Sequence, residues 1–155
     1  MRTALAASQQ ALRDMKLDAD LLEPQDKDGY VILFGNNKID GQISLTSQTP
    51  ELTTFNVKVK NGMSREDSIE RAILDVLHKK SGSISSQAKF DFRGYDQIRQ
   101  KPDTQAQQLA WFRQGASLPV SAAGNKHPGW LKIKLPSSKT GYLTGDISES
   151  HTVKK

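Results

Sequence analysis

The chain has 155 residues and a mass of 17.2 kDa, a size that suits either one compact domain or two small ones. Apolar residues make up only 35% of it, and no apolar stretch approaches the length of a membrane-spanning helix. The absence of cysteine excludes disulfide scaffolds, zinc ribbons, thiol nucleophiles and iron–sulfur clusters.

The positive charge is concentrated in the second part of the chain. Residues 1–88 hold 11 Lys and Arg against 12 Asp and Glu, whereas residues 89–155 hold 11 against 5. A basic module attached to a neutral one favours a polyanionic partner such as nucleic acid, anionic lipid or an acidic wall polymer. Alternatively, scattered lysines only keep a small domain in solution, since no run of four basic residues occurs.

Residues 1–17 are predicted to form a short helix, because Leu5, Leu12 and Met15 can share one face. They lack the uninterrupted apolar core of a secretory signal. We therefore expect a cytoplasmic protein or, if a signal has been removed, a periplasmic or cell-envelope protein. Residues 18–28 are predicted to be an acidic connector.

A small sheet and a second helix are predicted next. The strands are the apolar run Tyr30–Phe34 and the alternating segments Gln42–Thr46 and Phe55–Lys60. A helix is predicted from Ser64 to Lys80, where apolar residues recur on one side. Residues 1–80 are thus expected to form one domain, in which this helix packs on the sheet.

The second half has a different pattern. Residues 81–88, rich in Ser and Gly, predict a flexible linker. In residues 89–150, short apolar pairs separated by Gly, Pro and Lys predict a small barrel of five or six strands. Residues 151–155 are predicted to be a disordered basic tail. We expect residues 89–155 to fold without the first domain.

Four motifs in residues 90–148 resemble the bacterial Src-homology-3-like (SH3b) family. Its usual motifs are V-R-x-x-P, G-x-L-x-x-G, W-x-K-V and, after a hairpin, G-Y/W-V. The corresponding segments here are Ile98–Pro102, Ala110–Gly115, Trp130–Ile133 and Gly141–Leu143. The resemblance implies a β-barrel recognition module without chemistry of its own, appended to wall hydrolases and other envelope proteins, many of which bind peptidoglycan peptides.

The predicted fold class is therefore α+β: an N-terminal helix plus a small antiparallel sheet with a packed helix, followed by a C-terminal SH3-like β-barrel. The three histidines are too scattered to form a local metal motif, and the common zinc-protease, phosphate-loop and serine-hydrolase motifs do not occur. We therefore predict a non-enzymatic protein with no catalytic residue, no metal site and no cofactor.

Aromatic residues of the second half are the candidate ligand-binding residues. Trp130 begins a strand whose other side carries Leu131 and Ile133. If Phe112 faces the core, the preceding Trp111 faces outward and is available for binding. Alternatively, both tryptophans pack against the first domain. The predicted ligand-binding residues are Tyr95, Trp111, Trp130 and Tyr142.

We expect a binding or adaptor protein of the bacterial cell envelope, in which the SH3b module recognises a peptidoglycan peptide or a protein partner. The alternative is a cytosolic nucleic-acid-binding or regulatory adaptor, whose basic residues contact phosphates while a tryptophan stacks on bases. The predicted anion contacts are Arg99, Lys132, Lys134 and Lys139.

Overall fold

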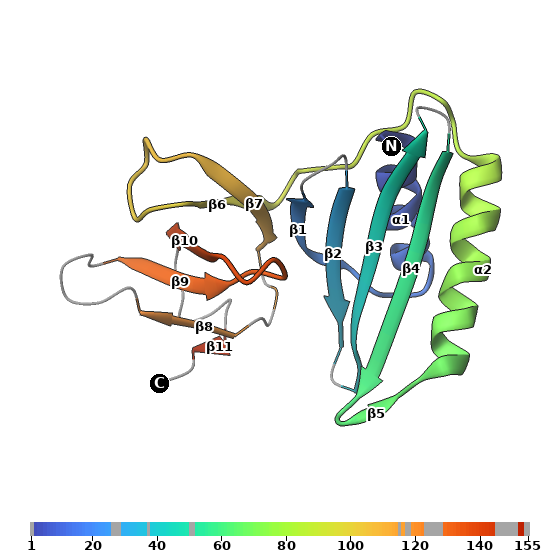
Figure 1. The fold of residues 1–155 in the computed structure, drawn as a ribbon, viewed down its shortest axis with the longest axis horizontal. Coiled ribbons are helices and arrows are strands. Elements are labelled where there is room, and N and C mark those ends of the chain that lie inside the picture. Colours follow the sequence, from blue (N-terminus) through green and yellow to red (C-terminus); the bar gives the residue numbers. More distant parts are fainter. Residues whose placement is uncertain are drawn as a thin grey trace. The chain divides into compact units, whose positions relative to one another are not determined.

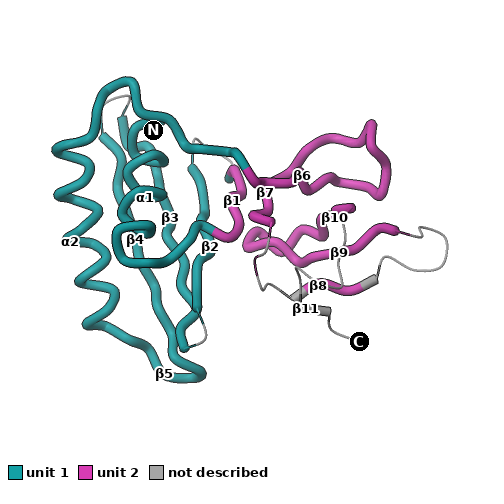
Figure 2. Tube along the Cα trace, turned by 180° about the vertical axis from the view of Figure 1, so that it is seen from behind, with its two compact units in different colours: residues 1–19, 25–93 teal, residues 20–24, 94–155 magenta. Residues whose placement is uncertain are grey.

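The computed structural model of the protein contains two compact units, shown in separate colours in Figure 2. The first consists of residues 1–19 and 25–93, and the second of residues 20–24 and 94–155. The structure describes residues 2–25, 29–36, 38–49, 52–114, 116, 119–122, 129–144 and 152–153.

The first unit combines a sheet with two helices (Figure 1). Its antiparallel strands follow the order β2-β3-β4-β5. Helix α2 packs on β4 and on α1, which also contacts β3. The elements are α1 (Arg2–Asp14), β2 (Gly29–Gly35), β3 (Asp40–Thr49), β4 (Leu52–Asn61), β5 (Ser64–Arg65) and α2 (Asp67–Ser83).

The start of α2 differs from the prediction. Ser64, expected to open the helix, lies in β5, and α2 begins at Asp67. Glu66 occupies the position before the helix, and its side chain makes no capping hydrogen bond. Its backbone N–H instead donates to the carbonyl of Val59 at 2.9 Å, so pairing with the sheet delays the helix start.

Side chains alternate along each strand, and on β3 and β4 the buried apolar ones lie on one face of the sheet. Ile32, Ile43 and Val57 are directly paired across three strands, and all three are buried. Ile73 and Leu77 of α2 are fully buried as well. The alternation in the sequence therefore identified which side of β3 and β4 faces the core.

Gly41 makes room for an aromatic ring. It pairs directly with Phe34, which is 3% exposed. A Cβ atom at Gly41 would lie 2.1 Å from Cζ and 2.3 Å from Cε2 of Phe34. No side chain can occupy that position unless the ring moves.

Glu70, in the first turn of α2, ties the helix to the sheet. Its carboxylate accepts hydrogen bonds from the backbone N–H of Val59 at 2.8 Å and from Nε and Nη2 of Arg65 at 2.9 and 3.1 Å. Because these donors favour the charged form, the pKa of Glu70 lies below its ordinary value, with Arg65 as the largest cause.

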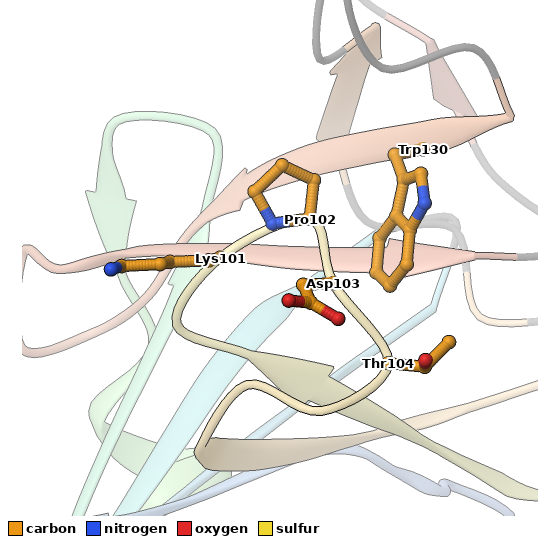
Figure 3. A pocket seen from close by; sticks show the side chains of 5 residues that line it. All are labelled: Lys101, Pro102, Asp103, Thr104 and Trp130. Carbon is orange, nitrogen blue, oxygen red and sulfur yellow. The ribbon is translucent and has the colours of Figure 1, made fainter.

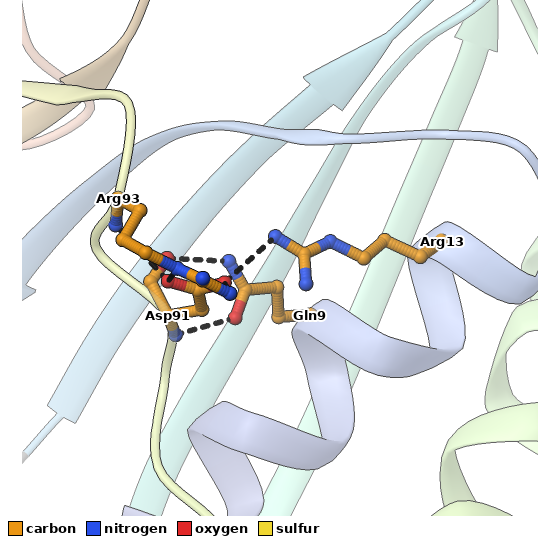
Figure 4. Close-up of polar contacts among 4 residues, drawn as sticks. All are labelled: Gln9, Arg13, Asp91 and Arg93. Carbon is orange, nitrogen blue, oxygen red and sulfur yellow. Dashed lines mark hydrogen bonds and ion pairs between the residues drawn. The ribbon is translucent and has the colours of Figure 1, made fainter.

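A second polar cluster fastens the end of this unit to α1 (Figure 4). The buried Gln9 donates from Nε2 to the carbonyl of Asp91 at 2.9 Å and accepts the Asp91 N–H at 2.7 Å. The Asp91 carboxylate accepts two hydrogen bonds from the Arg93 side chain and lies 3.7 Å from Arg13. Arg93 is the main cause that places the pKa of Asp91 well below its ordinary range.

The second unit is built from strands that follow the order β11-β8-β9-β10-β6-β7-β1. Neighbouring strands are antiparallel except β8 and β11, which are parallel. The strands are β1 (Ala19–Gln25), β6 (Tyr95–Arg99), β7 (Gln108–Arg113), β8 (Pro119–Ala122), β9 (Trp130–Lys134), β10 (Thr140–Thr144) and β11 (Thr152–Val153).

The predicted fold class, with its C-terminal SH3-like barrel, is wrong. A barrel closes only when the first and last strands of the order pair, and β11 and β1 do not. The described chain is instead dominated by open antiparallel sheet, accompanied by two helices. The physical reason is β1: the segment predicted to be an acidic connector is a strand that pairs with β7.

Two carboxylates hold β1 in the second unit. Asp20 accepts hydrogen bonds from Nε and Nη2 of Arg113 at 3.0 and 2.7 Å. Glu23, which is 2% exposed, accepts the backbone N–H of Ser137 at 2.9 Å and its hydroxyl at 2.5 Å. Leu21 lies between them and is fully buried. An acidic strand can therefore lie in the interior of this unit.

The core of the second unit is continuous with β1. Leu21 lies directly opposite Phe112, and both are fully buried, as are Ile98 and Leu143. Ile98 also covers Gly141: a Cβ atom at Gly141 would lie 2.2 Å from Cγ2 of Ile98. The unit depends on a segment that precedes the rest of it by about seventy residues.

The division of the chain also differs from the expected boundaries. The first unit extends to Arg93, and the first three residues of the predicted linker, 81–88, belong to α2. In the predicted tail, Thr152–Val153 form β11, and the rest of 151–155 lies outside the described residues. Neither described helix has the length and apolar character needed to cross a membrane.

We predict that Gly41→Ala lowers the free energy of unfolding of the first unit by about 1–3 kcal/mol, as overpacking typically does. Gly82→Ala is the control, because its Cβ would have no neighbour within 4 Å. Chemical denaturation followed by far-UV circular dichroism measures both variants, since the described helices belong to this unit. Equal stability of the two variants would contradict the role assigned to Phe34.

Glu70 is predicted to make the stability of the first unit dependent on pH. Its folded pKa is lowered from 4.5, so its contribution is complete well above pH 4.5 and is lost as the pH falls through the folded pKa. Glu70→Gln should therefore be less stable than the parent at pH 7, and the difference should shrink towards pH 3. Denaturation across this range measures it, with Asp75→Asn, an exposed aspartate of α2, as the control. A pH-independent difference would refute this assignment.

Residues 89–155 are now predicted not to fold alone, contrary to the expectation from the sequence. Without β1, Phe112 loses the opposing Leu21 and Arg113 loses its carboxylate. We expect poor amide dispersion in the NMR spectrum of this fragment, and recovery when a peptide of residues 18–25 is added. A peptide with both Asp20→Asn and Glu23→Gln should restore dispersion less well. A dispersed spectrum without any peptide would show that β1 is dispensable.

Candidate ligand-binding site

Strand β9 separates a core side from an outer side in the second unit. Leu131 and Ile133 are buried, whereas Trp130 is half-buried and Lys132 and Lys134 are exposed. The parity predicted from the sequence is thus confirmed for this strand. Trp130 and the two lysines share the outer side.

A row of three polar residues crosses the outer side. Tyr142 of β10 lies directly opposite Lys132 of β9 on one side and Arg99 of β6 on the other. Directly opposed residues of antiparallel strands have Cβ atoms about 4.5–5.5 Å apart. The phenol of Tyr142 is therefore flanked by two cationic side chains. Trp130 precedes Lys132 by two residues, a distance of roughly 7 Å along the strand.

The guanidinium of Arg99 donates hydrogen bonds to two neighbouring residues. Its Nη1 donates to the carbonyl of Ala106 at 2.8 Å, and its Nη2 donates to Oε1 of Gln97 at 2.5 Å. These bonds use one N–H of each terminal nitrogen, and the bond to Ala106 anchors the loop between β6 and β7. Within the described part of the chain, Lys132 and Lys134 form no ion pair.

A cleft of about 600 Å³ lies beside Trp130 (Figure 3). One wall is Trp130, and the other is the loop after β6, which supplies Lys101, Pro102, Asp103 and Thr104. In Figure 3 the indole and the side chains of Asp103 and Thr104 border the same cleft, whereas the Lys101 side chain extends away from the indole. The cleft therefore combines an aromatic face, a proline ring and a carboxylate.

Short turns give the loop its shape. The N–H of Asp103 donates to the carbonyl of Lys101 at 2.8 Å, and the carbonyl of Asp103 accepts the N–H of Ala106 at 3.0 Å. Oδ1 of Asp103 accepts the N–H of Gln105 at 2.9 Å. No described residue donates to Oδ2, the second carboxylate oxygen of Asp103. One oxygen thus positions the carboxylate, and the other is available to a ligand.

Four of the eight predicted site residues lie close to one another on the outer side of the second unit, on β6, β9 and β10. They are Arg99, Trp130, Lys132 and Tyr142. Lys134 is farther along β9, roughly 13 Å from Trp130. Lys139 lies in the turn at the opposite end of this hairpin.

The other two predicted aromatic residues lie elsewhere in the sheet. Tyr95 begins β6 and lies opposite Arg113. Trp111 is on β7, between Leu22 of β1 and Gln97 of β6, and is half-buried. Two strands separate β7 from the β9 strand that carries Trp130. The structure does not bring the two tryptophans into one site.

The loop wall was not identified from the sequence. Pro102 indicated a turn after β6, but nothing local indicated that this turn faces Trp130. That placement results from the pairing of β6 with β10 and of β10 with β9. Asp103, the one carboxylate among the described residues that line the cleft, was therefore missed.

The groups that line this cleft are an indole, a proline ring, a hydroxyl, a carboxylate and an ammonium group. In the part of the chain that the structure describes, no three His, Asp or Glu side chains are grouped so that they could hold a metal ion. Comparison with protein-family models, with curated proteins and with solved structures gives no match for this chain. The groups that surround the cleft offer stacking, apolar contact and ionic hydrogen bonds to a bound molecule.

Proposed function

We propose that the second unit is a non-enzymatic recognition module that binds a short extended peptide in the cleft beside Trp130. The supporting observation is the cleft itself, in which an indole faces a turn-stabilised loop carrying Pro102 and Asp103. Binding sites typically combine aromatic and apolar walls with a few placed polar groups. Tryptophan, tyrosine and arginine are enriched among the few residues that contribute most to the affinity of protein interfaces.

A peptide of the bacterial cell wall is the first candidate ligand. The support is the resemblance of four motifs in residues 90–148 to those of modules found in envelope proteins. Two of these motifs, Trp130–Ile133 and Gly141–Leu143, lie in the β9–β10 hairpin beside the cleft. This ligand would place the protein in the cell envelope. A segment of a protein partner is the other peptide to be tested.

Nucleic acid is a second candidate, favoured by one observation. Lys132 and Arg99 flank Tyr142, so an aromatic ring and two cations share one surface, as in single-strand binding proteins. One feature opposes this function: the carboxylate of Asp103 in the cleft would repel a phosphate.

Trp130→Ala is predicted to weaken binding to insoluble peptidoglycan by on the order of thirtyfold, the usual effect of truncating a tryptophan that anchors a ligand. Co-sedimentation of the full chain with purified cell-wall sacculi measures the affinity. Met63→Ala is the control, because Met63 is 99% exposed in the first unit. Circular dichroism confirms that the variants are folded.

Competitors in the same assay separate the two candidates. If the ligand is a peptide, heparin and single-stranded DNA should compete poorly, and the affinity should change little with salt. If nucleic acid is the ligand, the affinity for it should fall steeply as salt rises, because phosphate contacts release counterions. Unchanged binding of Trp130→Ala to sacculi would exclude the proposed cleft.

A further inference from the structure

The wall of the Trp130 cleft carries a negative charge that no residue in the described part of the chain neutralises. Asp103 uses one carboxylate oxygen for the N–H of Gln105, and no described residue donates to the other. Lys101 borders the same cleft, but its side chain extends away from the indole and forms no ion pair with Asp103. A carboxylate next to an aromatic face is complementary to a cation, through the ring quadrupole and an ionic hydrogen bond.

We infer that this cleft receives a primary ammonium group at the end of an alkyl chain, such as that of a lysine residue in the bound peptide. The methylene groups contact Pro102 and the indole of Trp130, and the ammonium donates to the free oxygen of Asp103. This inference rests on the proposed peptide-binding function and names the group by which the peptide is recognised.

An ammonium group makes a smaller demand on Asp103 than a guanidinium group. An ammonium is a point charge and needs only the oxygen that Gln105 does not use. A guanidinium pairs best through two parallel hydrogen bonds that use both oxygens. Oδ1 would then accept two N–H groups, as Oε2 of Glu70 does in the first unit, and the arginine probe described below tests this alternative.

The neighbouring cations indicate what else the ligand carries. Lys132 lies on the same side of β9, roughly 7 Å beyond Trp130, and has no ion-pair partner among the described residues. A ligand with an ammonium in the cleft and a carboxylate over Lys132 would match both charges. A zwitterionic peptide has these two groups, whereas a nucleic acid has only the negative one.

The experiment is an NMR titration of the full chain with three small probes. They are Nα-acetyl-lysine methylamide, its Nε-acetylated neutral form, and the corresponding arginine derivative. The indole N–H of Trp130 and the amides of residues 101–104 report binding, and the indole of Trp111, two strands away, is the internal reference. The variant is Asp103→Asn, which retains an oxygen to accept the Gln105 N–H, and the control is Asp75→Asn.

We expect the lysine probe to shift the Trp130 signal and to bind about fivefold or more tightly than the neutral form. Asp103→Asn should abolish that preference, and Asp75→Asn should retain it. The inference is overturned if the lysine and neutral probes bind equally, if Asp103→Asn keeps the preference, or if the arginine probe binds more tightly. Binding to sacculi that needs Trp130 but ignores these probes would leave the proposed function standing and remove this inference alone.

Discussion

The second unit is stable only if the two buried carboxylates of β1, Asp20 and Glu23, have hydrogen-bond donors. Burying a carboxylate costs several kcal/mol unless charged or polar donors replace the lost water. Arg113, at the end of β7, serves Asp20, and Ser137, in the β9–β10 turn, serves Glu23. Strand β1 thereby links β7 to the β9–β10 hairpin that carries Trp130. The hairpin beside the cleft is therefore held in part by a strand that is far from it in sequence.

These same contacts explain why the fold was only partly predictable. Local alternation was sufficient for β3, β4 and β9, because burial of every second residue needs no knowledge of distant partners. In β1, alternation is absent, and Asp20 and Glu23 are residues that normally face water. Their partners lie 93 and 114 residues farther along the chain. In the sequence, a strand stabilised by such distant donors looks like a connector. Because β1 was not recognised as a strand, the open sheet could not be anticipated.

The candidate site was predictable to a similar degree. Parity was enough to select Trp130 as outward-facing, and residue type added Tyr142, but the same reasoning also selected Trp111 and Tyr95, which lie elsewhere. Strand order decides which outward residues become neighbours, and the pairing of β10 with both β6 and β9 is a property of the whole unit. For the same reason, the loop with Asp103 acquires its role only through tertiary structure.

The charge of the second half illustrates how composition and geometry can favour different ligands. An excess of 11 basic over 5 acidic residues in 89–155 favours a polyanion when the residues are only counted. At physiological ionic strength, however, exposed charges more than about 8 Å apart are largely screened from one another. A ligand in the cleft therefore responds mainly to the few groups within that distance, which include Asp103, Lys101 and the indole of Trp130 in the cleft and Lys132 beside it. The placement of these individual charges, rather than the net charge of residues 89–155, is what the proposed specificity depends on.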